Sequence, residues 1–111
     1  MTSEEEKICN ASFEIIAGVG QARSLYIRAI HSAEAFDFDQ AGAYIDEGKK
    51  AYLEGHARHT ELLQQVVDGT ETPVNMILAH AEDQLMSAEG FGILAEEFIT
   101  VCKLIEGRSD V

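Results

Sequence analysis

The stretch that decides the fold runs from Phe38 to Val66 and reads "FDQAGAYIDEGKKAYLEGHARHTELLQQV". Within it, apolar and small residues recur at alternating spacings of three and four, with one histidine among them: Phe38, Ala41, Ile45, Gly48, Tyr52, Gly55, His59, Leu62 and Val66. Residues at these spacings share one face of an α-helix, and so long a repeat is typical of the seam between packed helices. The stretch therefore predicts a helix of roughly 30 residues that packs along its whole length.

Both ends of this helix carry end signals. Asp37 is a good N-cap, and Gln40 occupies the reciprocal capping position three residues later. Gly69 suits the glycine that follows the last turn of a helix, and Pro73 suits the first turn of a new one. The sequence thus predicts that a further helix follows.

The segments on either side also read as long helices. Two overlapping capping boxes, Thr2-x-x-Glu5 and Ser3-x-x-Glu6, start the first helix at Thr2 or Ser3. Its apolar face consists of Ile8, Ile15, Val19, Tyr26 and Ile30, and is interrupted by Ser12 and Arg23. The last helix ends at Gly107. Its seam is predicted to consist of Ile77, His80, Gln84, Ser87, Phe91, Leu94, Phe98, Val101 and Ile105. Gly18 and Gly20 in the first helix are expected to allow another helix to approach closely.

Residues 1–111 are therefore predicted to form a single all-α domain of three long antiparallel helices. Three thin helices offer little core for their surface. Further apolar residues lie beside the main stripes, namely Ile16, Ile27, Leu53 and Leu63. We expect a homo-oligomer in which the seam of the last helix is partly used between chains. The alternative is a monomer with ordinary apolar spillover.

Charge and composition exclude several classes of partner. The net charge of −12 repels phosphate backbones and anionic membranes, which argues against nucleic-acid binding. No apolar run approaches the roughly 20 residues that span a bilayer, so no direct membrane insertion is expected. The N-terminus is acidic, unlike a signal peptide, and a cytoplasmic location is predicted. Cys9 and Cys102 fall at opposite ends of the predicted bundle, so no disulfide is expected.

Polar residues interrupt the seam of the last helix in its first half. His80 and Gln84 share a face at i, i+4, and Asp83 flanks them. These residues form either a site or a polar layer that fixes register and oligomeric state. His56 and His59, at i, i+3, are either a metal-ligand pair or histidines at the edge of the core. A ferritin-like dinuclear site is not expected, because no histidine has the required glutamate three residues before it.

Three motifs, in this order and spacing, carry a family resemblance. They are "GQARSLYIRAI" from Gly20, "EGHARHTELL" from Glu54 and "HAEDQLM" from His80. Together they resemble the lactose/cellobiose-type (including diacetylchitobiose) enzyme IIA proteins of the bacterial sugar phosphotransferase system, whose patterns are roughly "SGQARS", "EAH..QT.L" and "HAQDHLM". The resemblance extends from about Phe13 to Glu106.

The resemblance implies a cytoplasmic phosphocarrier that forms a homotrimeric nine-helix bundle. His80 would accept a phosphoryl group from the phosphohistidine of HPr and pass it to a cysteine of the IIB component, for uptake of a β-linked disaccharide. Asp83 would meet its two symmetry mates around a structural divalent cation, for which Mg²⁺ suits the oxygen ligands. Gln84 and His56 are candidates for positioning the phosphoryl group, and Gln21 and Arg23 for an interface or partner surface.

Three positions depart from the family pattern. Gln84 replaces the second histidine of "HAQDHLM", Glu82 replaces its glutamine, and His59 replaces the glutamine before Thr60. Glu82 is expected to bring negative charge close to the phosphoryl group. These departures leave a second hypothesis open, in which the chain is a non-catalytic helical adaptor or a regulatory paralogue.

Overall fold

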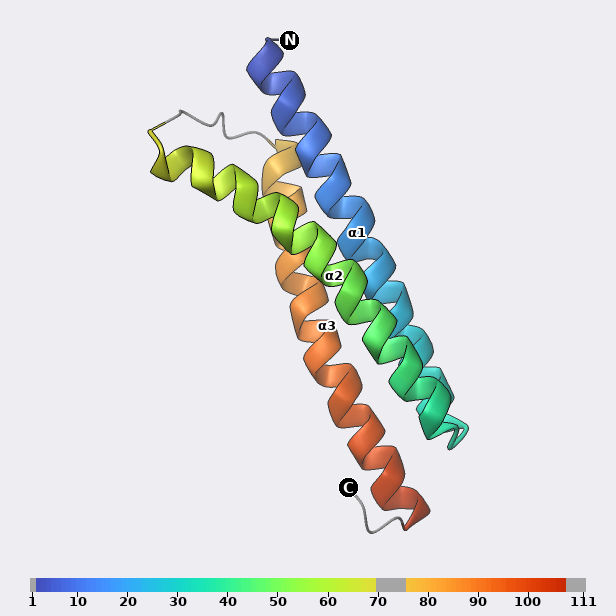
Figure 1. The fold of residues 1–111 in the computed structure, drawn as a ribbon. Coiled ribbons are helices and arrows are strands. Elements are labelled where there is room, and N and C mark those ends of the chain that lie inside the picture. Colours follow the sequence, from blue (N-terminus) through green and yellow to red (C-terminus); the bar gives the residue numbers. More distant parts are fainter. Residues whose placement is uncertain (1, 70–75, 108–111) are drawn as a thin grey trace.

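The computed structural model describes residues 2–69 and 76–107, and it consists of three long helices packed side by side (Figure 1). They are α1 (Ser3–Glu34), α2 (Phe38–Val67) and α3 (Met76–Glu106). Helices α1 and α3 run in the same direction, and α2, which lies between them in the sequence, runs antiparallel to both (Figure 1). The bundle is a rod, with Cα extents of 57 × 22 × 18 Å. The predicted all-α class with three long helices is confirmed.

The helix ends follow the sequence signals. Thr2 caps α1: its Oγ1 accepts the N–H of Glu5 at 3.1 Å, and the Glu5 carboxylate accepts the N–H of Thr2 in return. Asp37 caps α2 through its Oδ1, which accepts the N–H of Gln40 at 3.1 Å. Gly69 and Gly107 both have φ of +87°, the conformation that favours glycine after a helix. Pro73 and the side chain of Val66 lie outside the described residues.

The predicted faces of α1 and α2 form the core. On α1, Ile8, Ile15, Val19 and Tyr26 are buried and Ile30 is partly buried, and Ser12, which interrupts this face in the sequence, is buried with them. The α2 repeat also turns inward: Ala41, Ile45, Gly48, Gly55 and Leu62 are buried, and Phe38, Tyr52 and His59 are partly buried. Both predictions are confirmed.

Glycines set how closely the helices approach. A Cβ added to Gly18 would lie 3.3 Å from the backbone N of Gly55, so α1 and α2 touch there through backbone. Gly20, expected to do the same, has nothing within 4 Å of such a Cβ. Lower in the bundle, the ring of Tyr26 occupies a slot between Gly48 and Gly92, where an added Cβ would come within 2.6 Å and 2.9 Å of it.

Helix α3 departs from its predicted packing face. Its buried residues are Leu78, Ala81, Leu85, Ala88, Gly92, Ala95 and Cys102. The predicted seam is wrong as a core face within one chain, because Leu94 is 57% exposed, Phe98 49% and Ile105 71%. The reason is size: α3 is apolar on two sides, and the side with alanine and glycine lets it lie closer to α1 and α2.

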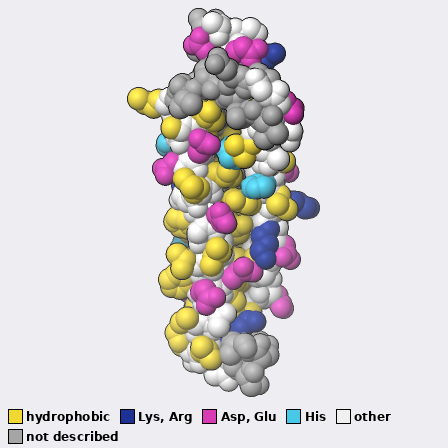
Figure 2. Space-filling view, turned by 90° about the vertical axis from the view of Figure 1, so that its left-hand side faces the viewer, with side chains coloured by type: hydrophobic (Ala, Val, Ile, Leu, Met, Phe, Trp, Pro, Cys, Tyr) yellow, Lys and Arg dark blue, Asp and Glu magenta, His cyan; other side chains and the backbone are white. Residues whose placement is uncertain are grey.

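The larger residues of α3 form what we call the outer stripe, defined as Phe91, Leu94, Phe98, Val101 and Ile105, all exposed. Figure 2 shows hydrophobic side chains gathered on the lower half of this side of the molecule. So much apolar surface on one helix is unusual for a protein that stays alone in water. Among the described helices, none combines the length and apolar character needed to cross a membrane. Cys9 and Cys102 are both free thiols, in agreement with the sequence prediction.

Candidate functional site

The candidate site lies on the first turns of α3, where His80 and Asp83 are both exposed. His80 continues the line of the outer stripe toward the N-terminal end of the helix, at its spacings of three and four, and Asp83 flanks this line. Within the described residues, no hydrogen bond or ion pair ties up the His80 ring. The imidazole is therefore open to solvent, and a ring nitrogen is available to react with a partner.

Gln84, one turn after His80, is held from α1. Arg23 Nη1 donates a hydrogen bond to Gln84 Oε1 over 2.6 Å, in a partly buried position. A guanidinium group only donates hydrogen bonds, so the carbonyl end of the Gln84 amide must face it. The amide NH₂ of Gln84 consequently points away from Arg23 and remains a donor.

Glu82 and His59 form a second pair, between α3 and α2. His59 Nε2 lies 2.8 Å from Glu82 Oε2, and the side chains are 16% and 44% exposed. Two residues along a helix are about 200° apart around its axis, so Glu82 and His80 lie on opposite sides of α3. The Glu82 carboxylate is thus directed toward His59, and its expected effect on a group at His80 stays a prediction. Two departures from the family pattern turn out to be partners of each other.

The contacts that the structure shows for His56 and Gln21 do not involve His80. The exposed ring of His56 lies against Tyr52, with centroids 5.9 Å apart, on the helix that contacts the Glu82 side of α3. Gln21 lines an open groove of 180 Å³ between α1 and α2, together with Glu47 and Glu54. Among the described residues, the hydrogen bond from Arg23 ties α1 to Gln84, on the face of α3 that carries His80.

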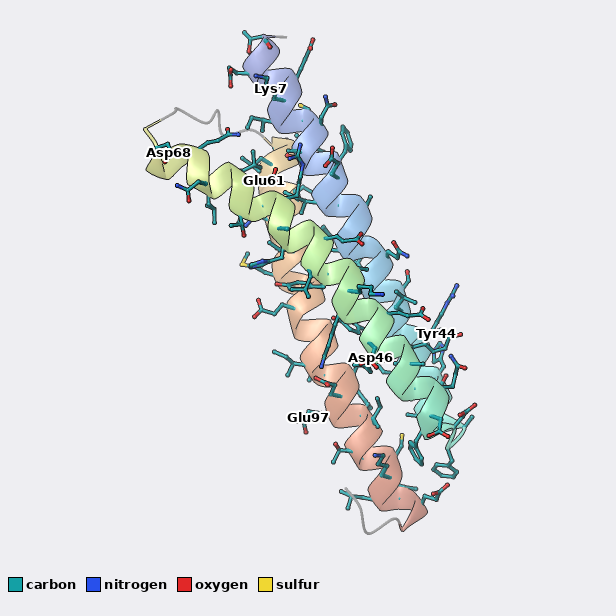
Figure 3. All side chains as sticks on the ribbon, viewed as in Figure 1. Lys7, Tyr44, Asp46, Glu61, Asp68 and Glu97 are labelled. Atoms are coloured by element: carbon teal, nitrogen blue, oxygen red, sulfur yellow. The ribbon has the colours of Figure 1, made fainter. Side chains whose placement is uncertain are left out.

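Other charged pairs connect the helices away from the site. Arg58 of α2 lies 2.6 Å from Glu14 of α1 and also pairs with Glu61, which is labelled in Figure 3. Lys49 and Glu96 join α2 to α3 at 3.0 Å and line an open groove of 350 Å³ together with Asp46. These side chains are more than a third exposed, so each pair stabilises the bundle little.

The residue that sequence reasoning undervalued is Arg23. It was grouped with Gln21 as a surface residue, but its guanidinium group reaches across to α3. The available signal was its place within the apolar face of α1, where a charged residue needs a partner.

Among the residues that the structure describes, no three His, Cys, Asp or Glu side chains come together in a way that could hold a metal ion. Asp83 is exposed, and no ion pair within the described part of the chain engages its carboxylate.

The comparisons with known proteins agree with the motifs. Residues 10–103 match the family model for the lactose/cellobiose-specific IIA subunit of the phosphotransferase (PTS) system. The lactose-specific EIIA component of Lacticaseibacillus casei is 34% identical over 87 residues, which cover 78% of each chain.

Two solved structures are similar in fold and sequence. The cellobiose-specific enzyme IIA of Bacillus anthracis superposes with a TM-score of 0.88 at 33% identity, covering 98% of this chain and 96% of that one. The IIA component in the IIA(Chitobiose)–HPr complex, from the N,N'-diacetylchitobiose branch of the Escherichia coli phosphotransferase system, gives a TM-score of 0.76 at 29% identity. That match covers 96% of this chain and 99% of the other.

Proposed function

Because the chain belongs to the lactose/cellobiose-specific IIA family of the phosphotransferase system, we propose that it is a phosphocarrier whose phosphoryl acceptor is His80. The observation that carries this assignment is the exposed ring of His80, which no other described residue engages. A neutral imidazole is a competent nucleophile near pH 7, and the helix holds it in place.

The transfer of the phosphoryl group from HPr to His80 needs no net gain or loss of a proton. A lone pair on one His80 nitrogen attacks the phosphorus of the phosphohistidine of HPr. A new N–P bond forms as the old N–P bond breaks, and the electron pair of that bond returns to the imidazole of HPr. Each ring keeps the hydrogen on its other nitrogen. Such a transfer needs mainly alignment and neutralisation of oxygen charge.

The partners follow from the family and from one structural relative. A similar IIA protein forms a complex with HPr, which supports HPr as the donor here. The acceptor is a cysteine of a IIB component: its thiolate attacks the phosphorus, the S–P bond forms, and the N–P bond to His80 breaks. Relatives are specific for lactose, cellobiose or diacetylchitobiose, which supports a β-linked disaccharide as the final acceptor. The sugar itself binds the membrane component, so no residue of this chain contacts it. A cytoplasmic location belongs to the same proposal.

We further propose that three copies assemble through the outer stripe. The exposed Phe91, Leu94 and Phe98 supply the apolar area that a stable interface needs. Asp83 lies beside this line, so a three-fold axis along α3 would bring three carboxylates together. Their mutual repulsion would be relieved by a divalent cation that prefers oxygen ligands, for which Mg²⁺ is the candidate. The cation would hold the assembly and take no part in the transfer.

The test is phosphorylation in a reconstituted system. The protein is incubated with phosphoenolpyruvate, enzyme I and HPr, and its intact mass is measured at neutral pH, because phosphohistidine is labile in acid. We expect a gain of one phosphate per chain that disappears in His80→Ala. His31→Ala is the matched control, since His31 is also exposed but lies at the end of α1, and it should keep the gain.

Two outcomes of this experiment would exclude His80 as the phosphoryl acceptor. If the wild-type protein gains no phosphate, or if His80→Ala still gains it, His80 is not the acceptor. In the first case the chain would be a helical adaptor or regulatory paralogue, in which the polar residues of α3 only set register.

A further inference from the structure

We propose that Arg23 is a positioning residue for the phosphoryl group on His80: it fixes the Gln84 amide as a donor and adds positive charge one helical turn away. This inference rests on the proposed function, with His80 as the acceptor. Its basis is the 2.6 Å hydrogen bond from Arg23 Nη1 to Gln84 Oε1.

The hydrogen bond determines the orientation of Gln84. An amide side chain can present either its oxygen or its NH₂ group toward a given point. Arg23 can only donate, so it captures the oxygen and leaves the NH₂ end facing elsewhere. Without Arg23 the amide could rotate, and its oxygen would then meet the phosphoryl oxygens with like charge. Arg23 therefore selects the orientation that is useful for binding an anion.

The helix places this donor at the correct distance from His80. Residues at i and i+4 lie on one face with Cβ atoms about 5–6 Å apart. In an α-helix the Cα–Cβ bonds tilt toward the N-terminus, so the Gln84 side chain leans toward His80. A phosphoryl group on the ring adds three strong acceptor oxygens. The NH₂ group of Gln84 can donate to those oxygens, and Arg23 holds its positive charge against the same amide.

The negative charge around the site favours a cation close to the phosphoryl group. The chain carries a net charge of −12, and the exposed Asp83 lies three residues from His80. A doubly negative phosphoryl group on the ring would be repelled by both. Glu82 is turned to the other side of α3 and is engaged by His59. Arg23, tied to Gln84, is the cation that the observed contacts bring to the His80 side of α3.

A purely structural role is the competing explanation. A hydrogen bond between α1 and α3 could simply set the register of the two helices. That role predicts a change in melting temperature on substitution, and no change in the chemistry at His80. The two explanations are separated by measuring the phosphotransfer equilibrium itself, namely the ratio of phosphorylated protein and free HPr to free protein and phosphorylated HPr.

The experiment uses the full chain with HPr, enzyme I and phosphoenolpyruvate. For Arg23→Met we expect the phosphotransfer equilibrium to shift toward phospho-HPr about tenfold, with a changed ³¹P chemical shift of the phosphohistidine. Arg23→Lys should recover part of the equilibrium, because it restores charge but not the planar donor. Arg28→Met is the matched control: it removes an exposed arginine from the same helix and should leave the equilibrium unchanged.

A second variant keeps the test decisive if Arg23→Met folds poorly. Gln84→Glu retains and strengthens the link to Arg23 but replaces the amide donor by an acceptor. A structural role predicts normal phosphorylation of this variant, whereas our proposal predicts that most of it is lost. An equilibrium unchanged in Arg23→Met, or normal phosphorylation of Gln84→Glu, would overturn the inference. A wild-type protein that takes no phosphate would instead overturn the proposed function.

Discussion

The two faces of α3 are both apolar, yet one is buried within the chain and the other is exposed. The inner face carries the small residues Ala81, Ala88 and Ala95, each fully buried, beside the buried Leu78 and Leu85. The outer stripe carries Leu94 and Phe98, which are about half exposed in the single chain. Hydropathy alone would bury the larger residues first, because they gain more from leaving water. The comparison teaches that size decides which apolar face packs within the chain and which is left for another partner.

The sharpest way to break this comparison is to charge the outer stripe. In the double variant Leu94→Glu, Phe98→Glu we expect complete loss of the trimer, because six buried charges would face one another, while each chain keeps most of its helix. Sedimentation equilibrium gives the mass, and circular dichroism gives the helix content. An intact trimer would mean that this stripe is not the interface.

A larger side chain on the inner face of α3 should instead destabilise the fold of the single chain. Ala88 is fully buried, so Ala88→Phe forces the helices apart and is expected to destabilise the fold by about 3 kcal/mol or more. Urea unfolding followed by circular dichroism measures the loss. Gly90→Ala is the matched control on the same helix. A Cβ there meets nothing within 4 Å, and the change should stabilise the chain by about 1 kcal/mol.

The carboxylate beside the outer stripe offers a finer test. In Asp83→Leu we expect the proposed cation site to be lost while the proposed trimer persists or tightens, by about 1–3 kcal/mol, since three converging charges would become apolar contacts. Elemental analysis of the purified protein reports the cation, and the dissociation constant reports the trimer. Dissociation into monomers would show that the cation, and not the apolar stripe, holds the chains together.

The smallest effect is expected on the side of α3 that faces α2. His59→Gln and Glu82→Gln break the 2.8 Å pair singly, and the double variant restores glutamines at both positions. Because Glu82 is 44% exposed, the coupling free energy of the two changes should be only about 0.5 kcal/mol. Phosphorylation of Glu82→Gln should equal that of the wild type. A strong loss would place Glu82 in the site after all.

Much of the fold could be predicted because its signals are local. Thr2 and Asp37 cap helices where their sequence neighbours indicate, and the residues of the α2 repeat that the structure describes are buried or partly buried. The family resemblance is also confirmed by the comparisons. The packing of α3 could not be predicted in the same way, because two faces compete and only the shape of the partner helices decides between them. Gly18 and Gly20 illustrate this limit: they read alike in sequence, and only Gly18 has a helix against it.

The residues of the site on α3 could be predicted from the sequence, but the contacts that other helices make with α3 could not. A resemblance pointed to His80, Asp83 and Gln84, and the structure places all three on one side of α3. The roles of these residues remain predictions. The pairing of Arg23 with Gln84, and of His59 with Glu82, depends on which helix faces which side of α3. Arg23 and Gln84 are 61 positions apart in the sequence, and His59 and Glu82 are 23 positions apart. At such separations no local sequence pattern indicates a contact.

The slot that holds Tyr26 also provides an optical reporter. The chain has no tryptophan and three tyrosines, so its ultraviolet emission comes from tyrosine alone. Tyr26 is only 3% exposed, whereas Tyr44 and Tyr52 are partly exposed. Iodide in solution should therefore quench the other two rings and spare the one between Gly48 and Gly92. The unquenched fraction of the emission would then follow the opening of the three helices in real time, without any label.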